Sequence, residues 1–276
     1  MVVGIVGLGL IGGSMAKAVS EHTGHKVLGA DIDPAVIEAA FTDGAIIGEL
    51  TDSRIALCEF IILALTPGLT ERWFAEKGAF VAKDTLVVDC CGTKRAVCAA
   101  GQAAASKYGF TFVGGHPMAG IEKMGYGASK ADLFKGASMI LVGPEDKEEM
   151  LTDFFTSIGF GGVVTATAEV HDAVIAYTSQ LAHVVSSAYI TSPTADKQAG
   201  FSAGSFKDMT RVAFLNEALW SELFLQNRDY LAHELDLLQG RPSDFREAIA
   251  SGDEARLLEM LAEGKQRKVH VDGGKA

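Results

Sequence analysis

The sequence has few cysteines, and their arrangement excludes two kinds of site. Its 276 residues contain four, at positions 58, 90, 91 and 98. Their spacing matches no metal site, and the adjacent Cys90 and Cys91 are poor disulfide partners in ordinary geometry. We therefore expect no metal centre and no disulfide framework. The free thiols favour a reducing, cytoplasmic setting.

The sequence also lacks long apolar runs and an excess of positive charge. No run approaches the roughly 20 residues that a membrane helix needs. Since the first residues lead straight into a strand pattern, we expect no signal peptide and no membrane partner. The formal net charge is −11, from 24 basic and 35 acidic residues. This argues against a nucleic-acid partner, because binding phosphates needs a basic surface.

The N-terminal part of the chain alternates short apolar runs with helical patterns, among a total of 31 glycines. The runs predict buried strands at 2–6, 26–30, 60–65, 85–89, 111–113, 139–142 and 159–164. Helical patterns lie between them, at 11–20, 34–41, 71–82, 94–108 and 147–157. Such alternation predicts βαβ units, and hence an α/β domain of the Rossmann type with a mostly parallel sheet.

The pattern changes after residue 165. Helix-spaced apolar residues at 169–190, 206–239 and 243–262 predict an all-helical region without strands. Gly240-Arg241-Pro242 predicts a turn before Ser243, which would cap the next helix. Residues 265–276 are polar, so we expect a frayed tail. The chain is thus predicted to have an α/β domain at 1–165 and an all-helical domain at 166–276.

A glycine motif follows the first predicted strand and opens the first predicted helix. It reads Gly7-Leu8-Gly9-Leu10-Ile11-Gly12. In this context Gly7 permits a tight turn, Gly9 lets backbone N–H groups reach a pyrophosphate, and Gly12 lets helix and strand pack closely. The alternative is a tight turn without a ligand. We expect these six residues to bind a dinucleotide.

An acidic residue follows the second strand. Asp31 stands about 20 residues after the glycine motif, where a carboxylate binds the adenosine ribose hydroxyls and repels a 2′-phosphate. The pattern therefore favours NAD over NADP. Asp31 could instead cap the next helix, but Asp33 suits that role better. Thr66 ends the third strand, on the edge where cofactors lie in such sheets, although a simple turn is a comparable alternative there.

The segment Gly114-Gly115-His116-Pro117-Met118-Ala119-Gly120 presents one histidine among glycines. Glycine tolerates the close approach of ligands, and proline stiffens the chain after the histidine. Downstream of a nucleotide motif, such a histidine indicates a general base in a redox site. A turn histidine without chemistry is the alternative.

The chain resembles the prephenate and arogenate dehydrogenases of tyrosine biosynthesis. The resemblance covers nearly the whole chain and rests on the glycine motif, on 89–94, on 114–120 with Glu122-Lys123, and on Phe206-Lys207-Asp208-Met209-Thr210-Arg211. It implies that 1–165 is an NAD-binding domain and that 166–276 is a helical substrate and dimerisation domain, which forms a homodimer. The implied reaction is the oxidative decarboxylation of prephenate to 4-hydroxyphenylpyruvate with NAD. It also leaves open arogenate as the substrate, or both compounds. Another two-domain dehydrogenase and a non-enzymatic NAD-binding regulator are the remaining alternatives.

The resemblance implies roles for five residues. His116 would be the base for the ring hydroxyl, and Arg211 would bind a substrate carboxylate, for which its planar fork is suited. His183 would lie near the substrate side chain, and Glu122 would gate or polarise the site. Lys207 would line the substrate site, pair with Asp208 or cap the helix. A surface arginine, a histidine in a helix interface and a solvated carboxylate are the alternatives for Arg211, His183 and Glu122. His171 is expected to be structural.

The chain departs from the family pattern at two places. Many relatives have a serine near the catalytic histidine, where this chain has Gly92. Thr93 or a water would replace that hydroxyl, or His116 would be oriented differently. Gln180 also stands where relatives have a histidine, in a segment that bears on the choice between prephenate and arogenate.

Overall fold

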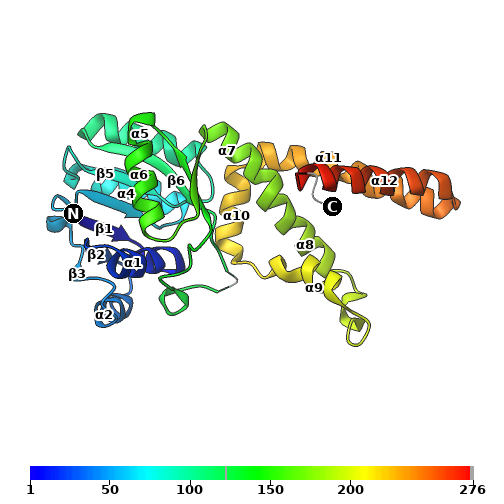
Figure 1. Ribbon diagram of the computed structural model, residues 1–276, viewed down its shortest axis with the longest axis horizontal. Helices are drawn as coiled ribbons and strands as arrows, with labels where there is room; N and C mark the ends of the chain where they lie inside the picture. Colours follow the sequence, from blue (N-terminus) through cyan, green and yellow to red (C-terminus); the bar gives the residue numbers. More distant parts are fainter. Residues whose placement is uncertain (122, 274–276) are drawn as a thin grey trace. The chain divides into compact units, whose positions relative to one another are not determined.

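The chain folds into two compact units. The structure is a computed structural model that describes residues 1–121 and 123–273. The units are Met1–Asn227 and Arg228–Ala276. The first contains the sheet and the helices up to α10, and the second contains α11 and α12 (Figure 1). The boundary expected at residue 165 lies between β8 (Gly162–Thr165) and α7 (Ala168–Ile175), and it stays a prediction.

The first unit is built around one sheet with the strand order β3-β2-β1-β4-β5-β6-β7-β8. Every neighbouring pair is parallel except β6 and β7, which are antiparallel. The strands before β8 are β1 (Val2–Val6), β2 (Lys26–Ala30), β3 (Gly48–Glu49), β4 (Phe60–Leu63), β5 (Leu86–Asp89), β6 (Thr111–Pro117) and β7 (Ser138–Val142). This order is that of a dinucleotide-binding fold, in which the ligand lies where the strand order reverses, here between β1 and β4.

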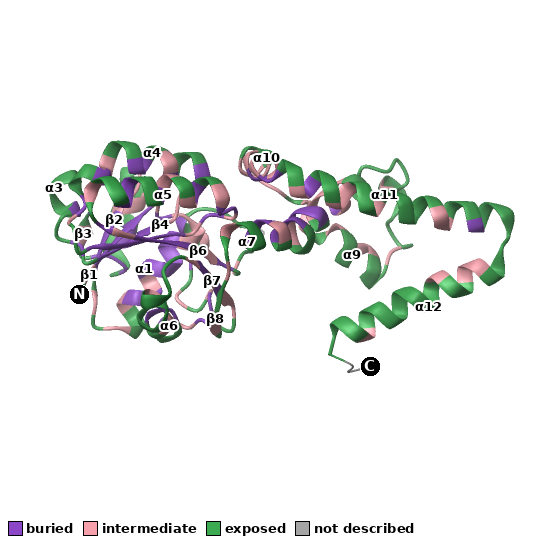
Figure 2. Ribbon diagram, turned by 90° about the horizontal axis from the view of Figure 1, so that it is seen from above, coloured by how far each residue is buried: buried purple, intermediate pink, exposed green. Residues whose placement is uncertain are grey.

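Helices cover both faces of the sheet. One core cluster joins α1 and α6 to one face, and the other joins α4 and α5 to the opposite face. Figure 2 shows the buried residues concentrated in the strands between these two helical layers. The helices are α1 (Leu10–His22), α2 (Pro34–Thr42), α3 (Asp52–Ile55), α4 (Pro67–Lys77), α5 (Arg95–Tyr108) and α6 (Glu148–Ser157). The predicted fold class, a mostly parallel α/β sheet followed by helices, is confirmed.

Strand alternation produces the two core clusters. In β4, Ile62 packs into one cluster, whereas Ile61 and Leu63 pack into the other. Since successive side chains of a strand point to opposite faces, a run of apolar residues buries both faces at once. This explains why the strands of this sheet have continuous apolar sequences.

Helices α7 to α10 complete the first unit. The predicted helix at 169–190 is continuous but changes its winding, because a π-helix (Ala176–Leu181) joins α7 to α8 (Ala182–Ile190). The predicted stretch at 206–239 is interrupted twice. It contains α9 (Gly204–Thr210), α10 (Glu217–Gln226) and the start of α11 (Arg228–Ser251). Asn216 caps α10 by accepting a hydrogen bond from Leu219 N–H.

The turn predicted at 240–242 is wrong, because α11 runs through Pro242. The chain breaks instead at Gly252, whose φ is +69°, and Asp253 caps α12 (Glu254–Val271). Pro242 removes one helical N–H. The Ser243 hydroxyl, which we expected to cap a new helix, donates to the Gln239 carbonyl of the same helix at 3.2 Å.

The second unit is a hairpin of two helices tied by ion pairs. Arg241 on α11 pairs with Glu263 on α12 at 3.1 Å, and Arg256 on α12 reaches Glu247 on α11 at 2.8 Å. The frayed tail predicted from residue 265 is wrong up to Val271, because α12 extends that far and Lys268 pairs with Asp272. Within 1–121 and 123–273, no helix has the length and apolar character to span a membrane.

Candidate functional site

The glycine motif forms the turn between β1 and α1. Gly7 has a φ of +84°, and a Cβ added at Gly12 would lie 1.8 Å from the Gly7 carbonyl oxygen. Both positions therefore require glycine. A Cβ added at Gly9, by contrast, would meet no atom within 4 Å. The turn thus packs tightly on its inner side and leaves open space above Gly9.

The start of α1 offers free polar groups to this space. Its first intrahelical bond runs from Gly13 N–H to the Gly9 carbonyl at 2.9 Å, and its first turn contains no acidic residue. The preceding N–H groups and the positive end of the helix dipole favour an anion such as a pyrophosphate. The residues present therefore fit a dinucleotide.

Asp31 lies beside this loop, directly after β2. Its carboxylate accepts hydrogen bonds from Leu8 N–H at 2.8 Å and from Asp33 N–H at 3.0 Å. Asp33 caps α2 by accepting from Ala35 N–H at 2.9 Å. Asp31 also lines a shallow pocket together with Glu38 and Glu49. These three carboxylates would repel a 2′-phosphate.

Thr66 caps α4 with its backbone. Its hydroxyl makes no capping bond to the helix. The N–H of Gly68 in the first turn donates instead to the carboxylate of Glu222 on α10. Thr66 therefore lies just after the carboxyl end of β4. Gly68, two residues later in the chain, contacts the Glu222 carboxylate of α10.

His116 lies within a strand. The predicted strand at 111–113 is too short, because β6 continues to Pro117 and pairs His116 with Ile140 of β7. The glycines before it permit close packing, since a Cβ on Gly115 would lie 2.3 Å from the Asp89 carbonyl oxygen. We expected Pro117 to stiffen the chain after His116, and the pairing of β6 with β7 holds both residues in place. His116 itself is partly exposed.

A buried ion pair holds the backbone before His116. Lys94 and Asp89 are fully buried and directly bonded, and Lys94 Nζ also donates to the Gly115 carbonyl at 2.6 Å. Asp89 accepts from Gly115 N–H at 3.0 Å and from Cys91 N–H at 2.8 Å. Burial alone would lower the pKa of Lys94, but Asp89 beside it raises that pKa above its ordinary value.

The side chain of His116 contacts a second histidine. Its Nδ1 lies 2.9 Å from Nε2 of His171 on α7, and Nδ1 of His171 lies 2.8 Å from Oδ1 of Asp172. His171 and Asp172 are both buried. Burial, His171 and Lys94 lower the pKa of His116 well below its usual range, so the imidazole is neutral at pH 7.

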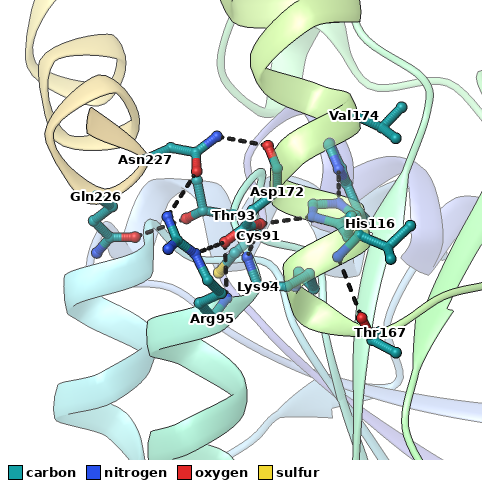
Figure 3. A network of polar contacts seen from close by, with 12 residues as sticks. Cys91, Thr93, Lys94, Arg95, His116, Thr167, Asp172, Val174, Gln226 and Asn227 are labelled. Carbon is teal, nitrogen blue, oxygen red and sulfur yellow. Dashed lines mark hydrogen bonds and ion pairs between the residues drawn. The ribbon is translucent and has the colours of Figure 1, made fainter. Parts of the chain in front are cut away.

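Asp172 connects this chain of contacts to the start of α5. It accepts from Lys94 N–H at 2.7 Å and from Arg95 N–H at 3.0 Å, so a residue of α7 caps α5. Burial would raise the pKa of Asp172, but hydrogen bonds from His171, Arg95 and Lys94 hold that pKa below its ordinary value. Figure 3 shows His116 on one side of this network and Asn227 on the other.

The departure at Gly92 has a structural counterpart. A Cβ added there would lie 3.3 Å from Leu223 Cδ2 and 4.0 Å from His116 Nε2. The Leu223 side chain therefore packs closely against the position where a side chain on residue 92 would begin. The Thr93 hydroxyl donates to Gln226 Oε1 at 2.7 Å, so its proton points towards α10.

Two residues of the helical region have defined polar contacts. His183 Nδ1 lies 2.8 Å from the Val212 carbonyl oxygen, and its ring packs on Trp220 with centroids 3.8 Å apart. Gln180 is buried, and its amide contacts the Leu223 carbonyl at 3.2 Å and Asn227 at 2.8 Å. Gln180 therefore joins the π-helix to α10.

Other predicted substrate residues lie on the surface of the same region. Lys207 is exposed on α9, and Arg211 is exposed just after it, in a short 3-10 helix (Arg211–Ala213). Glu122 lies outside the described residues. In 1–121 and 123–273 no cluster of side chains could hold a metal ion.

The sequence analysis gave no role in the site to four buried residues, Asp89, Lys94, His171 and Asp172, and it expected His171 to be structural. Asp89 and Lys94 belong to the segment that carried the resemblance, but their buried pairing was not foreseen. The adjacent His171 and Asp172 offered a signal too, since a carboxylate beside a histidine orients imidazoles in many sites.

The chain is similar to one known family over most of its length. The family model described as "Prephenate dehydrogenase, nucleotide-binding domain" matches residues 15–164, and the one described as "Prephenate dehydrogenase, dimerization domain" matches 167–263. The prephenate dehydrogenase of Bacillus subtilis is 31% identical over 246 residues, which cover 84% of this chain and 66% of that protein. The chain thus spans about two thirds of that relative's length.

Two further proteins match over nearly their full length. The cyclohexadienyl dehydrogenase of Zymomonas mobilis is 28% identical, with 97% of this chain and 94% of that protein covered. A crystal structure of prephenate dehydrogenase from A. aeolicus in complex with hydroxyphenyl propionate and NAD+ has a TM-score of 0.80 at 27% identity, and 98% of each chain is covered. The resemblance seen in the motifs is confirmed: the chain belongs to the prephenate dehydrogenase family.

Proposed function

We propose that this protein catalyses the NAD-dependent oxidative decarboxylation of prephenate to 4-hydroxyphenylpyruvate, in tyrosine biosynthesis. The observation that carries the proposal is His116, neutral and bonded to a buried histidine, on the sheet that also bears the dinucleotide loop. The loop after β1 and the end of β6 both belong to the carboxyl edge of the parallel strands, where α/β enzymes bind ligands. Relatives named prephenate dehydrogenase support the same substrate.

His116 would act as the base. NAD supplies the hydride acceptor, to which C4 of the substrate ring delivers its hydride. The neutral imidazole accepts the proton of the C4 hydroxyl. The bond to the ring carboxylate breaks, its electron pair enters the ring, and carbon dioxide leaves. The ring becomes aromatic, so the protein has chiefly to orient C4 and polarise the hydroxyl.

The remaining site residues would bind the substrate or the cofactor. Arg211 would form a bidentate pair with a carboxylate, with Lys207 adding positive charge. His183 would lie near the substrate side chain, and Thr93 would contribute to the lining. Glu122 would act as a gate or polarising group.

NAD fits the glycine loop because Gly9 leaves space for a pyrophosphate. Asp31 would bind the ribose hydroxyls, and Thr66 would lie at the cofactor. The relative that was crystallised with NAD+ supports this cofactor.

A second candidate is arogenate, alone or together with prephenate. The full-length match to a cyclohexadienyl dehydrogenase favours it. The two substrates differ only by a keto or amino group on the side chain. A pocket discriminates strongly between such groups only where it forms a hydrogen bond to one of them. A non-enzymatic NAD-binding regulator is the lower-ranked alternative.

The test is NADH formation, followed by absorbance, with prephenate and with arogenate in parallel. We expect turnover with prephenate and a higher kcat/KM for it than for arogenate. The reverse ratio would assign arogenate. Absence of turnover with both, in protein that still binds NAD, would overturn the enzyme assignment and favour a regulator.

We also propose a homodimer formed by the helical region. The second unit exposes apolar side chains, since Ile249, Leu258 and Leu261 are all at least 60% exposed. Exposed apolar surface of this kind marks sites of protein association. A cytoplasmic location is part of the same proposal and is supported by four free cysteines. Light scattering on the purified chain would measure twice the mass of 29.1 kDa. A mass of one chain at micromolar concentration would contradict the dimer.

A further inference from the structure

We infer that His171 and Asp172 are positioning residues that fix the tautomer of His116, so that His116 Nδ1 carries a proton and Nε2 faces the substrate as a bare acceptor. This inference deepens the proposed function and rests on it for the substrate. The tautomer itself follows from contacts within the described residues. It assigns roles to two side chains for which the sequence motifs indicated none.

The assignment starts at Asp172. An ionised carboxylate accepts hydrogen bonds and donates none. Asp172 already accepts backbone N–H groups from Lys94 and Arg95, and the Arg95 Nε at 3.2 Å. These three donors favour the ionised form of the carboxylate. His171 Nδ1, at 2.8 Å from Oδ1, must therefore carry the proton of that hydrogen bond.

The next two steps follow from the chemistry of imidazole. A neutral ring has one N–H and one bare nitrogen, so a neutral His171 with its proton on Nδ1 has a bare Nε2. That nitrogen lies 2.9 Å from His116 Nδ1, which must donate. The other nitrogen of a neutral His116, Nε2, is then an acceptor. This nitrogen is also the one that lies 4.0 Å from the Cβ position of Gly92.

The same chain of contacts stabilises the proton once it is taken. When Nε2 of His116 accepts the hydroxyl proton, the Nδ1 proton can move to Nε2 of His171. The His171 imidazolium then lies between His116 and the Asp172 carboxylate. One proton enters at one end of the pair and one shifts within it, so the two rings hold a single added proton, which returns to the product oxygen or to water.

Charged groups around the pair oppose a second proton and favour this arrangement. Lys94, which precedes α5, and Arg95, its first residue, are cationic, and Asp89 of β5 neutralises Lys94. On α7, Asp172 is the only carboxylate bonded to a ring of the pair among the described residues, and Glu169 lies one turn earlier. The two rings therefore share one added proton through the contact between His116 Nδ1 and His171 Nε2.

The test is nitrogen NMR on protein labelled with ¹⁵N-histidine, which distinguishes protonated from bare ring nitrogens. The chain has seven histidines, and His116→Asn identifies the signals of His116. We expect a protonated Nδ1 and a bare Nε2 at pH 7.5 in the wild type. A bare Nδ1 with a protonated Nε2 would overturn the inference whatever the enzyme turns out to act on.

Variants separate positioning from structure. His171→Gln keeps an acceptor for His116 Nδ1 but cannot take a proton, whereas His171→Leu removes the acceptor. General-base catalysis contributes about 10²- to 10⁴-fold to a rate, and the variants should lose part of it. We expect kcat with prephenate and NAD to fall about tenfold or more in His171→Gln and further in His171→Leu. KM should change little in both variants. The acid limb of the kcat pH profile should move in His171→Gln.

Val170→Ala, a change at an exposed position of the same helix, is the matched control. Unchanged kcat and pH profile in a folded His171→Leu protein would contradict the inference. If the wild type turns over neither prephenate nor arogenate, the proposed function fails, but the NMR result still decides the tautomer.

Discussion

Replacement of Lys94 by methionine tests whether the buried ion pair holds the strand that carries His116. Methionine keeps most of the length of the side chain and removes its charge. The Asp89 carboxylate would keep the N–H groups of Cys91 and Gly115 but lose its cationic partner, and the Gly115 carbonyl would lose a donor. Lys94 and Asp89 are both inaccessible to solvent, so water cannot replace the ammonium.

The expected cost follows from the two contacts that are lost. A hydrogen bond to a charged group contributes about 1.5–3 kcal/mol, which gives roughly 3–6 kcal/mol for the pair. Breaking one side of a buried ion pair costs about 3–5 kcal/mol in other proteins. The two ranges overlap, so we expect the free energy of unfolding to fall by about 3–5 kcal/mol.

Urea denaturation followed by circular dichroism measures this change. Lys107→Met is the matched control, because Lys107 is exposed on α5, the helix that Lys94 precedes. The loss in this control should stay within about 0.5 kcal/mol. The double variant with Asp89→Asn should recover part of the loss, since it removes the uncompensated charge. A loss under about 1 kcal/mol in Lys94→Met would refute the reasoning.

Three further predictions concern the site. Gly92→Ser should fold with only a small shift of Leu223, since its Cβ would meet Leu223 at 3.3 Å, and should change kcat by less than His116→Asn does; a protein that fails to fold would contradict this. Arg211→Ala should raise KM for prephenate and leave kcat nearly unchanged in steady-state kinetics, whereas a fall in kcat alone would assign it another role. The wild type should lose about 1 kcal/mol of unfolding free energy between pH 7.5 and 5.5 from His116, because its folded pKa is lowered and the unfolded chain binds the proton near pH 6.5. The contribution of His116 to the unfolding free energy is fully present above its pKa in the unfolded chain, and it is lost as the pH falls towards its lower pKa in the folded protein. In urea titrations, His116→Asn should therefore lose less unfolding free energy on acidification than the wild type. An equal loss would contradict the assignment.

The parts of the fold that local sequence dictates were predictable. β1 (Val2–Val6) and β2 (Lys26–Ala30) match the predicted bounds, because their apolar runs end at Gly7 and Asp31. Long-range pairing was not visible. β6 extends past residue 113 because β7 pairs with it, and the glycines at 114 and 115 are there for close packing.

Proline misled the prediction of the helices. Pro242 suggested a break, but a proline costs a helix only one N–H bond and a local clash. Two ion pairs join α11 to α12 on either side of that point, one from Arg241 to Glu263 and one from Arg256 to Glu247. The break falls at Gly252, where a left-handed φ is needed.

The candidate site was predictable only in part. His116 and the glycine loop have local signatures, because their chemistry requires glycine next to the ligand or the reacting group. The contact between His116 and His171 joins residues 55 positions apart, and no local pattern encodes it. The same holds for Asp172, which caps a helix 77 residues earlier in the chain.

The central claim is that His116 is the base of an NAD-dependent dehydrogenase, and His116→Asn tests it most directly. Asparagine keeps a polar side chain on β6 but cannot accept a proton at neutral pH. We predict that kcat with prephenate falls by about 10²- to 10⁴-fold while the NAD dissociation constant, measured by calorimetry, stays the same. A variant that retains the kcat of the wild type would contradict the account.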